Sequence, residues 1–207
     1  VKAAAPEAIE QVSRRAGAQR ERWFEIAPGP RCGGLVQAVA DAGGGVKLRT
    51  GGLAAAQFPS TEAVAHMLIA TAMADVPFKA TAGLHHALAG VRPLPAPGDA
   101  ASGGGVPPDD GGTNACRMHG FLNVFLAALL ARQLVRFGYP DPEAHAALVA
   151  LLDQTGADAF EWADDHIRWR THRLDLAEIE GGRKRVRSFG CCSFDDPVAE
   201  VRALRLA

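Results

Sequence analysis

The sequence predicts an α/β protein in which parallel strands are covered by helices. Short apolar segments at 23–26, 46–50 and 76–81 each end at a glycine or proline turn, and segments with helical spacing separate them. This β-α-β-α-β order is typical of a parallel sheet, because parallel neighbours need a crossover between them. We expect one α/β domain over 1–207 that is (β/α)8-barrel-like, forming the C-terminal half of a barrel, or else a small open sheet.

The helices of the first half follow from capping and periodicity. Residues 6–22 have helical composition, and apolar residues from Leu35 to Val39 recur at helical spacing before a run of three glycines. The clearest helix begins at the N-cap Ser60 and ends near Asp75, with apolar side chains at i, i+3 and i+4.

The second half departs from this regular pattern. Residues 90–115 are rich in Gly, Pro and Asp without periodicity, which indicates a flexible loop. A helical insertion is expected over 119–180, before the last strand at 186–189 and a closing helix from Asp196. Its three helical segments are 121–137, 141–154 and 157–179.

Composition narrows the possible partners. The 207 residues carry 22 basic and 23 acidic side chains, so a net charge of −1 gives no reason to expect nucleic acid or an anionic membrane. The longest apolar run, 121–131, is too short to cross a bilayer. Residues 1–10 lack the apolar core of a signal peptide, and the four cysteines lack the spacing of a disulfide framework, so a cytoplasmic protein is expected. The barrel interpretation expects four earlier strands upstream.

Two lysines are the main catalytic candidates. Lys47 and Lys79 each lie inside an apolar strand segment that a glycine turn follows. A lysine on a central strand loses hydration, which disfavours the ammonium form and yields an amine that can form a Schiff base with an aldehyde or ketone. The alternative is that both side chains point outward to solvent.

Three short motifs resemble the last three strands of the deoxyribose-phosphate aldolase family. They are Lys47-x-x-Thr50-Gly51, Lys79-Ala80-x-x-Gly83-Leu84 and Phe189-Gly190-x-x-Ser193. The resemblance implies a (β/α)8 barrel and a lyase, with Lys47 as the Schiff-base lysine and Lys79 as the lysine that activates it. It also implies that Gly83 and the Gly190–Ser193 turn hold a phosphate. The family's strand with a catalytic aspartate has no evident counterpart in the sequence.

A second resemblance covers more of the chain. The segments KLRTGG, FPSTE, FKATAGLHH, HGFLN and FGCCSFDDP are similar to those of an uncharacterised bacterial α/β family. That resemblance implies no activity.

The remaining candidates surround these motifs. Arg49 shares a strand face with Lys47 and could bind a carboxylate or phosphate. His85 and His119 are candidate general acids or bases. The other expected contacts with a small-molecule substrate are Thr50, Gly51, Thr81, Gly83, His86, Asn123, Gly190 and Ser193.

Three hypotheses remain open from the sequence. The first is an aldolase-like lyase that needs no cofactor. The second is a metal-dependent hydrolase or lyase in which His85, His86 and His119 hold a divalent ion such as zinc. The third is a non-catalytic domain that binds a small anion or assembles into a homo-oligomer. The cysteines Cys32, Cys116, Cys191 and Cys192 do not have the spacing of a disulfide framework or of zinc knuckles.

Overall fold

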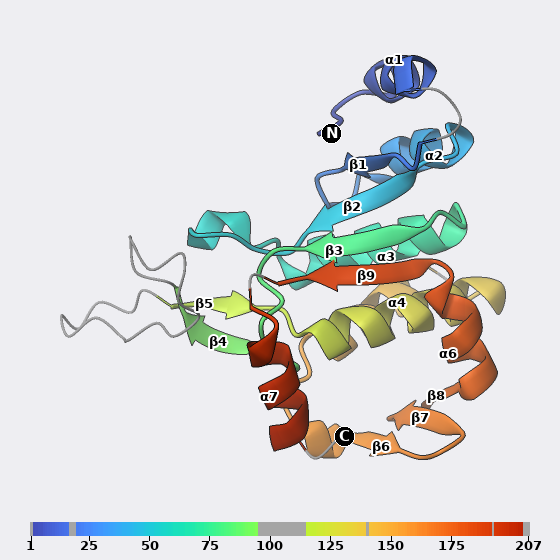
Figure 1. The fold of residues 1–207 in the computed structure, drawn as a ribbon. Coiled ribbons are helices and arrows are strands. Elements are labelled where there is room, and N and C mark those ends of the chain that lie inside the picture. Colours follow the sequence, from blue (N-terminus) through green and yellow to red (C-terminus); the bar gives the residue numbers. More distant parts are fainter. Residues whose placement is uncertain (1, 17–19, 95–114, 140, 192, 205–207) are drawn as a thin grey trace.

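A four-stranded parallel sheet forms the centre of the molecule (Figure 1). The computed structural model describes residues 2–16, 20–94, 115–139, 141–191 and 193–204. The strands follow one another in chain order and all neighbours are parallel. They are β1 (Trp23–Glu25), β2 (Gly45–Arg49), β3 (Phe78–Thr81) and β9 (Val186–Gly190). The expected α/β class is therefore confirmed, and among the described residues the sheet is open.

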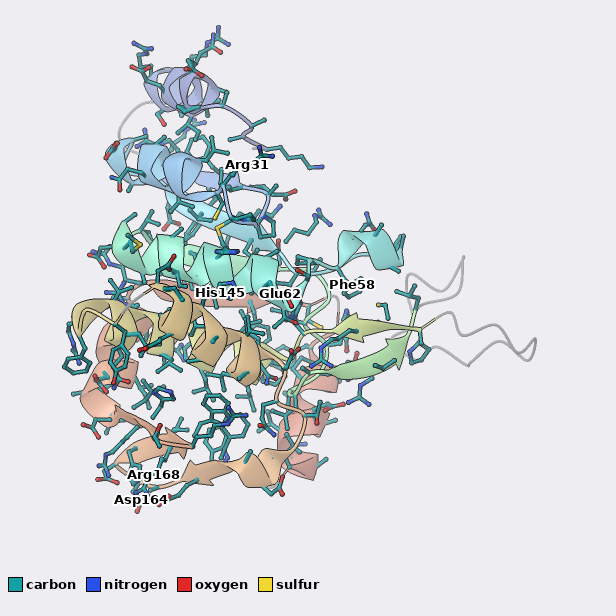
Figure 2. The ribbon with its side chains drawn as sticks, turned by 180° about the vertical axis from the view of Figure 1, so that it is seen from behind. Arg31, Phe58, Glu62, His145, Asp164 and Arg168 are labelled. Carbon is teal, nitrogen blue, oxygen red and sulfur yellow. The ribbon has the colours of Figure 1, made fainter. Side chains whose placement is uncertain are left out.

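Helices lie behind this sheet in the view of Figure 1 and in front of it in Figure 2. They are α2 (Gly33–Asp41), α3 (Thr61–Met73) and α4 (Phe121–Arg136), while α1 (Pro6–Ala16) packs against α2. Alternate strand residues point toward these helices and are almost fully buried, among them Phe24, Val46, Leu48, Phe78 and Ala80. Burial of these side chains is the main force that holds the helices to the sheet.

Helix α3 is apolar around most of its surface because it is covered on two sides. Ser60 caps it as expected, since its hydroxyl oxygen accepts a hydrogen bond from the amide of Ala63. Helix α5 (Asp141–Leu152) packs on the side of α3 away from the sheet. Figure 2 shows His145 of α5 beside Glu62 of α3, where its Nε2 atom lies 3.2 Å from the Glu62 carbonyl oxygen.

The prediction of a third helix in the insertion, over 157–179, is wrong. Residues 160–175 form a three-stranded antiparallel sheet of β6 (Phe160–Trp162), β7 (His166–Trp169) and β8 (His172–Asp175). A two-residue turn joins β7 to β8, and its Arg170 has a φ of 54°. That region usually requires Gly, Asn or Asp, so the turn has no recognisable sequence signal. Trp162 and Trp169 thus lie on strands, as do His166 and His172.

Apart from these strands, the described part of the second half consists mainly of helices. Helices α4 and α5 were expected, as were β9 and the closing helix α7 (Asp195–Ala203). Helix α6 (Leu176–Arg183) leads into β9. The short 3-10 helices are η1 (Ala55–Gln57) and η2 (Ala157–Ala159).

Strands also form at both ends of the segment expected to be a flexible loop. Strand β4 (Gly90–Pro93) pairs antiparallel with β5 (Ala115–Met118). Residues 95–114 lie outside the described residues. In the described part of the chain, no helix combines the length and the apolarity that crossing a membrane would need.

Two glycines bring the turns after β2 and β3 into direct contact. Gly83 has a φ of 76°, a region that side chains other than glycine rarely adopt. A Cβ atom on Gly83 would lie 2.8 Å from the Cα of Gly51, and one on Gly51 would lie equally close to Gly83. The two glycines therefore serve backbone packing at the carboxyl end of the sheet.

We predict that Gly83→Ala lowers the free energy of unfolding by about 2 kcal/mol or more, because it combines backbone strain with a clash against backbone atoms. Gly34→Ala in α2 is the matched control, since no atom lies within 4 Å of the added Cβ. The control should be neutral or slightly stabilising. Chemical denaturation measures both variants, and equal stabilities would contradict this role of Gly83.

Candidate functional site

The sheet face opposite the helices carries a row of polar side chains, one from each strand. Glu25 pairs in register with Lys47, Lys47 with Lys79, and Lys79 with Ser188. Residues at the same level of neighbouring strands point to the same face. Glu25, Lys47, Lys79 and Ser188 therefore form what we call the lysine row. The two lysines share one face on adjacent strands, as their matching positions in the sequence suggested.

Glu25 is the electrostatic centre of this row. Its carboxylate lies 2.7 Å from the Lys47 ammonium nitrogen and 3.4 Å from Nε of Arg49, and its side chain is only 10% exposed. The hydrogen bond from Lys47 is the main reason why the pKa of Glu25 falls below its ordinary value, with Arg49 adding to the effect against the cost of burial. Glu25 is therefore a carboxylate at neutral pH.

Lys79 has a different partner, Trp23, which lies on β1 like Glu25. Its ammonium nitrogen lies 4.5 Å from the centre of the Trp23 ring, a cation–π contact. The ring of Trp23 lies against Gly45, where a Cβ atom would be 2.5 Å from a ring carbon. A glycine at this position thus allows the indole to lie flat across the sheet and to reach Lys79.

The row extends one position beyond β1. Lys2 forms an isolated parallel bridge with Glu25, and the amide of Ala3 donates to the Glu25 carbonyl oxygen at 3.0 Å. The Lys2 ammonium nitrogen lies 4.0 Å from the Glu25 carboxylate, although its side chain is 84% exposed. Glu25 is thus approached by three cations, from Lys2, Lys47 and Arg49.

The two threonines at the carboxyl ends of β2 and β3 are committed to the backbone. Thr50 is fully buried, and its hydroxyl donates to the Ala82 carbonyl oxygen at 2.5 Å. The Thr81 hydroxyl donates to the Leu48 carbonyl oxygen at 3.4 Å. Thr50 therefore fixes the turn that holds Gly83, whereas Thr81 lies half-buried on the same face as Arg49, opposite Gly190.

The three histidines of the metal hypothesis face different partners. Nδ1 of His86 lies 2.9 Å from the Glu200 carboxylate, whereas Nε2 of His119 lies 2.8 Å from the Pro59 carbonyl oxygen. Nδ1 of His85 lies 3.0 Å from the sulfur of Cys191. Among the residues with described positions, no three His, Cys, Asp or Glu side chains are grouped so that they could hold a metal ion. The geometry gives the metal hypothesis no support.

His119 and Asn123 connect helices instead of lining the open face. His119 is 2% exposed and joins the start of α4 to the residue before the cap of α3. Asn123 is fully buried: its side-chain oxygen accepts from the Ala89 amide, and its nitrogen donates to the carbonyl oxygens of Leu151 and Gln154. All the hydrogen-bonding atoms of the Asn123 side chain are thus used within the protein.

Ser193 lies in the turn between β9 and α7. Its hydroxyl accepts from the amide of Asp196 at 3.2 Å, and its own amide faces the Cys191 sulfur at 3.4 Å. Gly190 ends β9 opposite Thr81. A Cβ atom on Gly190 would make only ordinary contacts, so the position does not depend on glycine for space.

Comparison with known proteins adds no relative: no family model, no curated protein and no solved structure matches the chain. The fold brings Lys47, Lys79 and Arg49 together on one face, with Thr81 and Gly190 at its carboxyl end. It places His119 and Asn123 between helices.

Sequence reasoning missed Glu25 and Trp23. Both lie in Trp23-Phe24-Glu25-Ile26, which reads as a short apolar strand. One signal was available: Glu25 interrupts an apolar segment just before a Pro-Gly-Pro turn, at the same place in its strand as Lys47 and Lys79 in theirs. A charged residue at that position in three successive strands indicates a shared face.

We predict that Glu25→Gln lowers the free energy of unfolding by about 1–2 kcal/mol at low salt, because the cations of Lys47 and Arg49 lose a mostly buried carboxylate. High salt should reduce the loss by screening their repulsion. Glu21→Gln is the control, since Glu21 pairs with Arg187 at an exposed position and should contribute under about 0.5 kcal/mol. A salt-independent effect equal to that of the control would contradict the role of Glu25.

We also predict that the protein loses stability as the pH falls through about 6.5, the ordinary pKa of histidine. Burial lowers the pKa of His119 in the folded state. Just below pH 6.5 this histidine is therefore protonated in the unfolded chain but still neutral in the folded protein. This contribution is complete above pH 6.5 and decreases below it, with a limiting slope of about 1.4 kcal/mol per pH unit. Denaturation between pH 5 and 8 should show a shallower decrease for His119→Gln than for the unchanged protein. Identical slopes would contradict the assignment.

Proposed function

We propose that this chain contributes the lysine-bearing part of an aldolase-like lyase site, in which Lys47 forms a Schiff base with a small carbonyl substrate. The observation that carries the proposal is the lysine row: two lysines in register on adjacent parallel strands, with the carboxylate of Glu25 2.7 Å from the Lys47 nitrogen. A Schiff-base site needs an amine, a group that moves protons and a nearby positive charge. The row supplies all three.

Glu25 is the proton carrier in this mechanism. It first accepts a proton from the Lys47 ammonium, and the neutral amine attacks the carbonyl carbon. In the addition product one proton moves from nitrogen to oxygen to give a carbinolamine, which loses water when Glu25 returns its proton to the hydroxyl group, and an iminium is left. Glu25, again a carboxylate, then accepts the proton of the substrate's β-hydroxyl group. The electrons of the bond between the α and β carbons move to the iminium, so that a carbonyl fragment leaves and an enamine stays on Lys47. The first of these transfers uses the 2.7 Å contact between Lys47 and Glu25.

Lys79 and Arg49 give the site its preference for anions. With Lys47 and Lys2 they give this face four cations, which exceed the one negative charge of Glu25. A substrate with a phosphate or carboxylate group balances that excess, and Arg49 can hold such a group through two nitrogens. The same excess supports the second candidate, a non-catalytic domain that binds a small anion.

The barrel interpretation is part of this proposal. Two features support it: the strands follow one another in chain order, and α2, α3 and α4 all cover the same face. In a (β/α)8 barrel the opposite face points inward, and chemistry is concentrated at the carboxyl ends of the strands. The lysine row would then line the inside of the barrel.

Trapping with borohydride tests the Schiff base. We predict that incubation with a panel of phosphorylated and unphosphorylated hydroxyaldehydes, followed by reduction, leaves a stable adduct on Lys47. Peptide mass spectrometry should find at least about tenfold less adduct on Lys184, an exposed lysine at the end of α6.

Variants separate the catalytic proposal from simple anion binding. Lys47→Arg keeps the positive charge but should abolish trapping, Lys79→Met should weaken it, and Lys184→Met should leave it unchanged. Adducts spread evenly over all lysines would overturn the lyase proposal. If anion binding persisted in Lys47→Arg without any trapping in the unchanged protein, the binding domain would be the correct interpretation.

A further inference from the structure

A second group of reactive side chains lies outside the lysine row, where the turn after β3 meets the turn after β9. The sulfur of Cys191 lies 3.0 Å from Nδ1 of His85, although 106 residues separate them. The same nitrogen lies 3.5 Å from the carboxylate of Asp196 in the first turn of α7. The thiol of Cys191 and the carboxylate of Asp196 thus both lie beside Nδ1 of His85.

The surroundings of Cys191 favour a thiolate. An imidazole within hydrogen-bonding distance can take the thiol proton, and the resulting imidazolium is stabilised by the carboxylate of Asp196. The amide of Ser193 donates toward the same sulfur at 3.4 Å, which places a second donor on the developing negative charge. Cys191 and His85 are both partly exposed.

The other described cysteines have the opposite environment. Burial raises the pKa of the Cys32 thiol, whose side chain lies in the core. Burial also raises the pKa of the Cys116 thiol on β5. A thiol with a raised pKa is a poor nucleophile near neutral pH. These two cysteines are therefore internal references for the reactivity of Cys191.

We propose that Cys191 is a nucleophilic thiolate activated by His85, and that it binds small aldehydes covalently. The pair suits a carbonyl electrophile because attack on a carbonyl carbon creates an alkoxide that needs a proton. The thiolate sulfur forms a bond to the carbonyl carbon, the carbonyl π electrons move to oxygen, and the His85 imidazolium protonates that oxygen. The product is a thiohemiacetal, and the reverse steps release the aldehyde.

This site does not depend on the proposed role of Lys47. Its chemistry needs only the Cys191 sulfur, the His85 ring and the Asp196 carboxylate. The two proposals can therefore be tested separately, because one is measured as modification of a cysteine and the other as modification of a lysine.

Alkylation by iodoacetamide measures the reactivity directly. A Cys192→Ser background leaves Cys191 as the single cysteine of its turn, and peptide mass spectrometry follows each site with time. At pH 7 we expect Cys191 to react at least about tenfold faster than Cys116, with a rate that is already near its plateau. A Cys191 rate equal to that of Cys116, still rising above pH 8.5, would overturn the activation.

Two neighbouring histidines provide a matched pair of variants. His85→Asn should slow alkylation of Cys191 about tenfold, because it removes the base beside the sulfur. His86→Asn should not, since Nδ1 of His86 faces the Glu200 carboxylate instead. Equal effects of both variants would indicate a change in folding and count against the proposal. The pH profile of the unchanged protein tests activation without any variant at position 85.

Propionaldehyde tests the class of ligand. Its presence should slow iodoacetamide labelling of Cys191 reversibly, without slowing that of Cys116, and dilution should restore the rate. A Cys191 that reacts rapidly but gains no protection from the aldehyde would refute the carbonyl assignment. Protection that persists in Lys47→Arg would confirm that it comes from the thiol site.

Discussion

The register between the parallel strands is the constraint on which the rest of this structure depends. In each strand, alternate residues face the helices and are apolar, such as Phe24, Leu48 and Ala80. The residues between them must face the other way. Because β1, β2 and β3 are aligned without offset, Glu25, Lys47 and Lys79 come to the same level. A shift of one residue in any strand would bury a charge under the helices.

Charge balance across the sheet follows from that register. Lys47 and Lys79 lie side by side, and their mutual repulsion would work against the alignment that core packing imposes. The carboxylate of Glu25 offsets it on one side, and the ring of Trp23 stabilises the second ammonium group. Strand β1 therefore supplies a stabilising partner for each of the two lysines.

The opposite end of the sheet is built differently. Asp75, just after α3, is bridged by Arg132 of α4 at 2.8 Å and by Arg185 before β9 at 2.5 Å. These contacts join helices to the amino end of a strand and lie away from the lysine row. They therefore stabilise the packing of α3, α4 and β9 at the amino end of the sheet.

Local signals in the sequence were sufficient for the alternating half of the fold. Glycine and proline turns separated the segments, and the cap at Ser60 located α3 closely. The positions of Lys47 and Lys79 before their turns correctly predicted a common face. The prediction of a helix over 157–179 failed although charged and apolar residues alternate there, which is a strand signal. The turn between the strands has Arg170 where a glycine would be recognised. Contacts such as Cys191 with His85 depend on the folded topology, which no local pattern encodes.

The contact between Gly51 and Gly83 has a mechanical consequence. Backbone touches backbone there, and the hydroxyl of Thr50 bonds to the carbonyl oxygen of Ala82 beside it. The two turns therefore restrain each other, because outward movement of one would break its contacts with the other. His85 follows Gly83 by two residues, so its backbone is held by the same contacts. Movement of His85 away from its place would therefore require the turns after β2 and β3 to shift together.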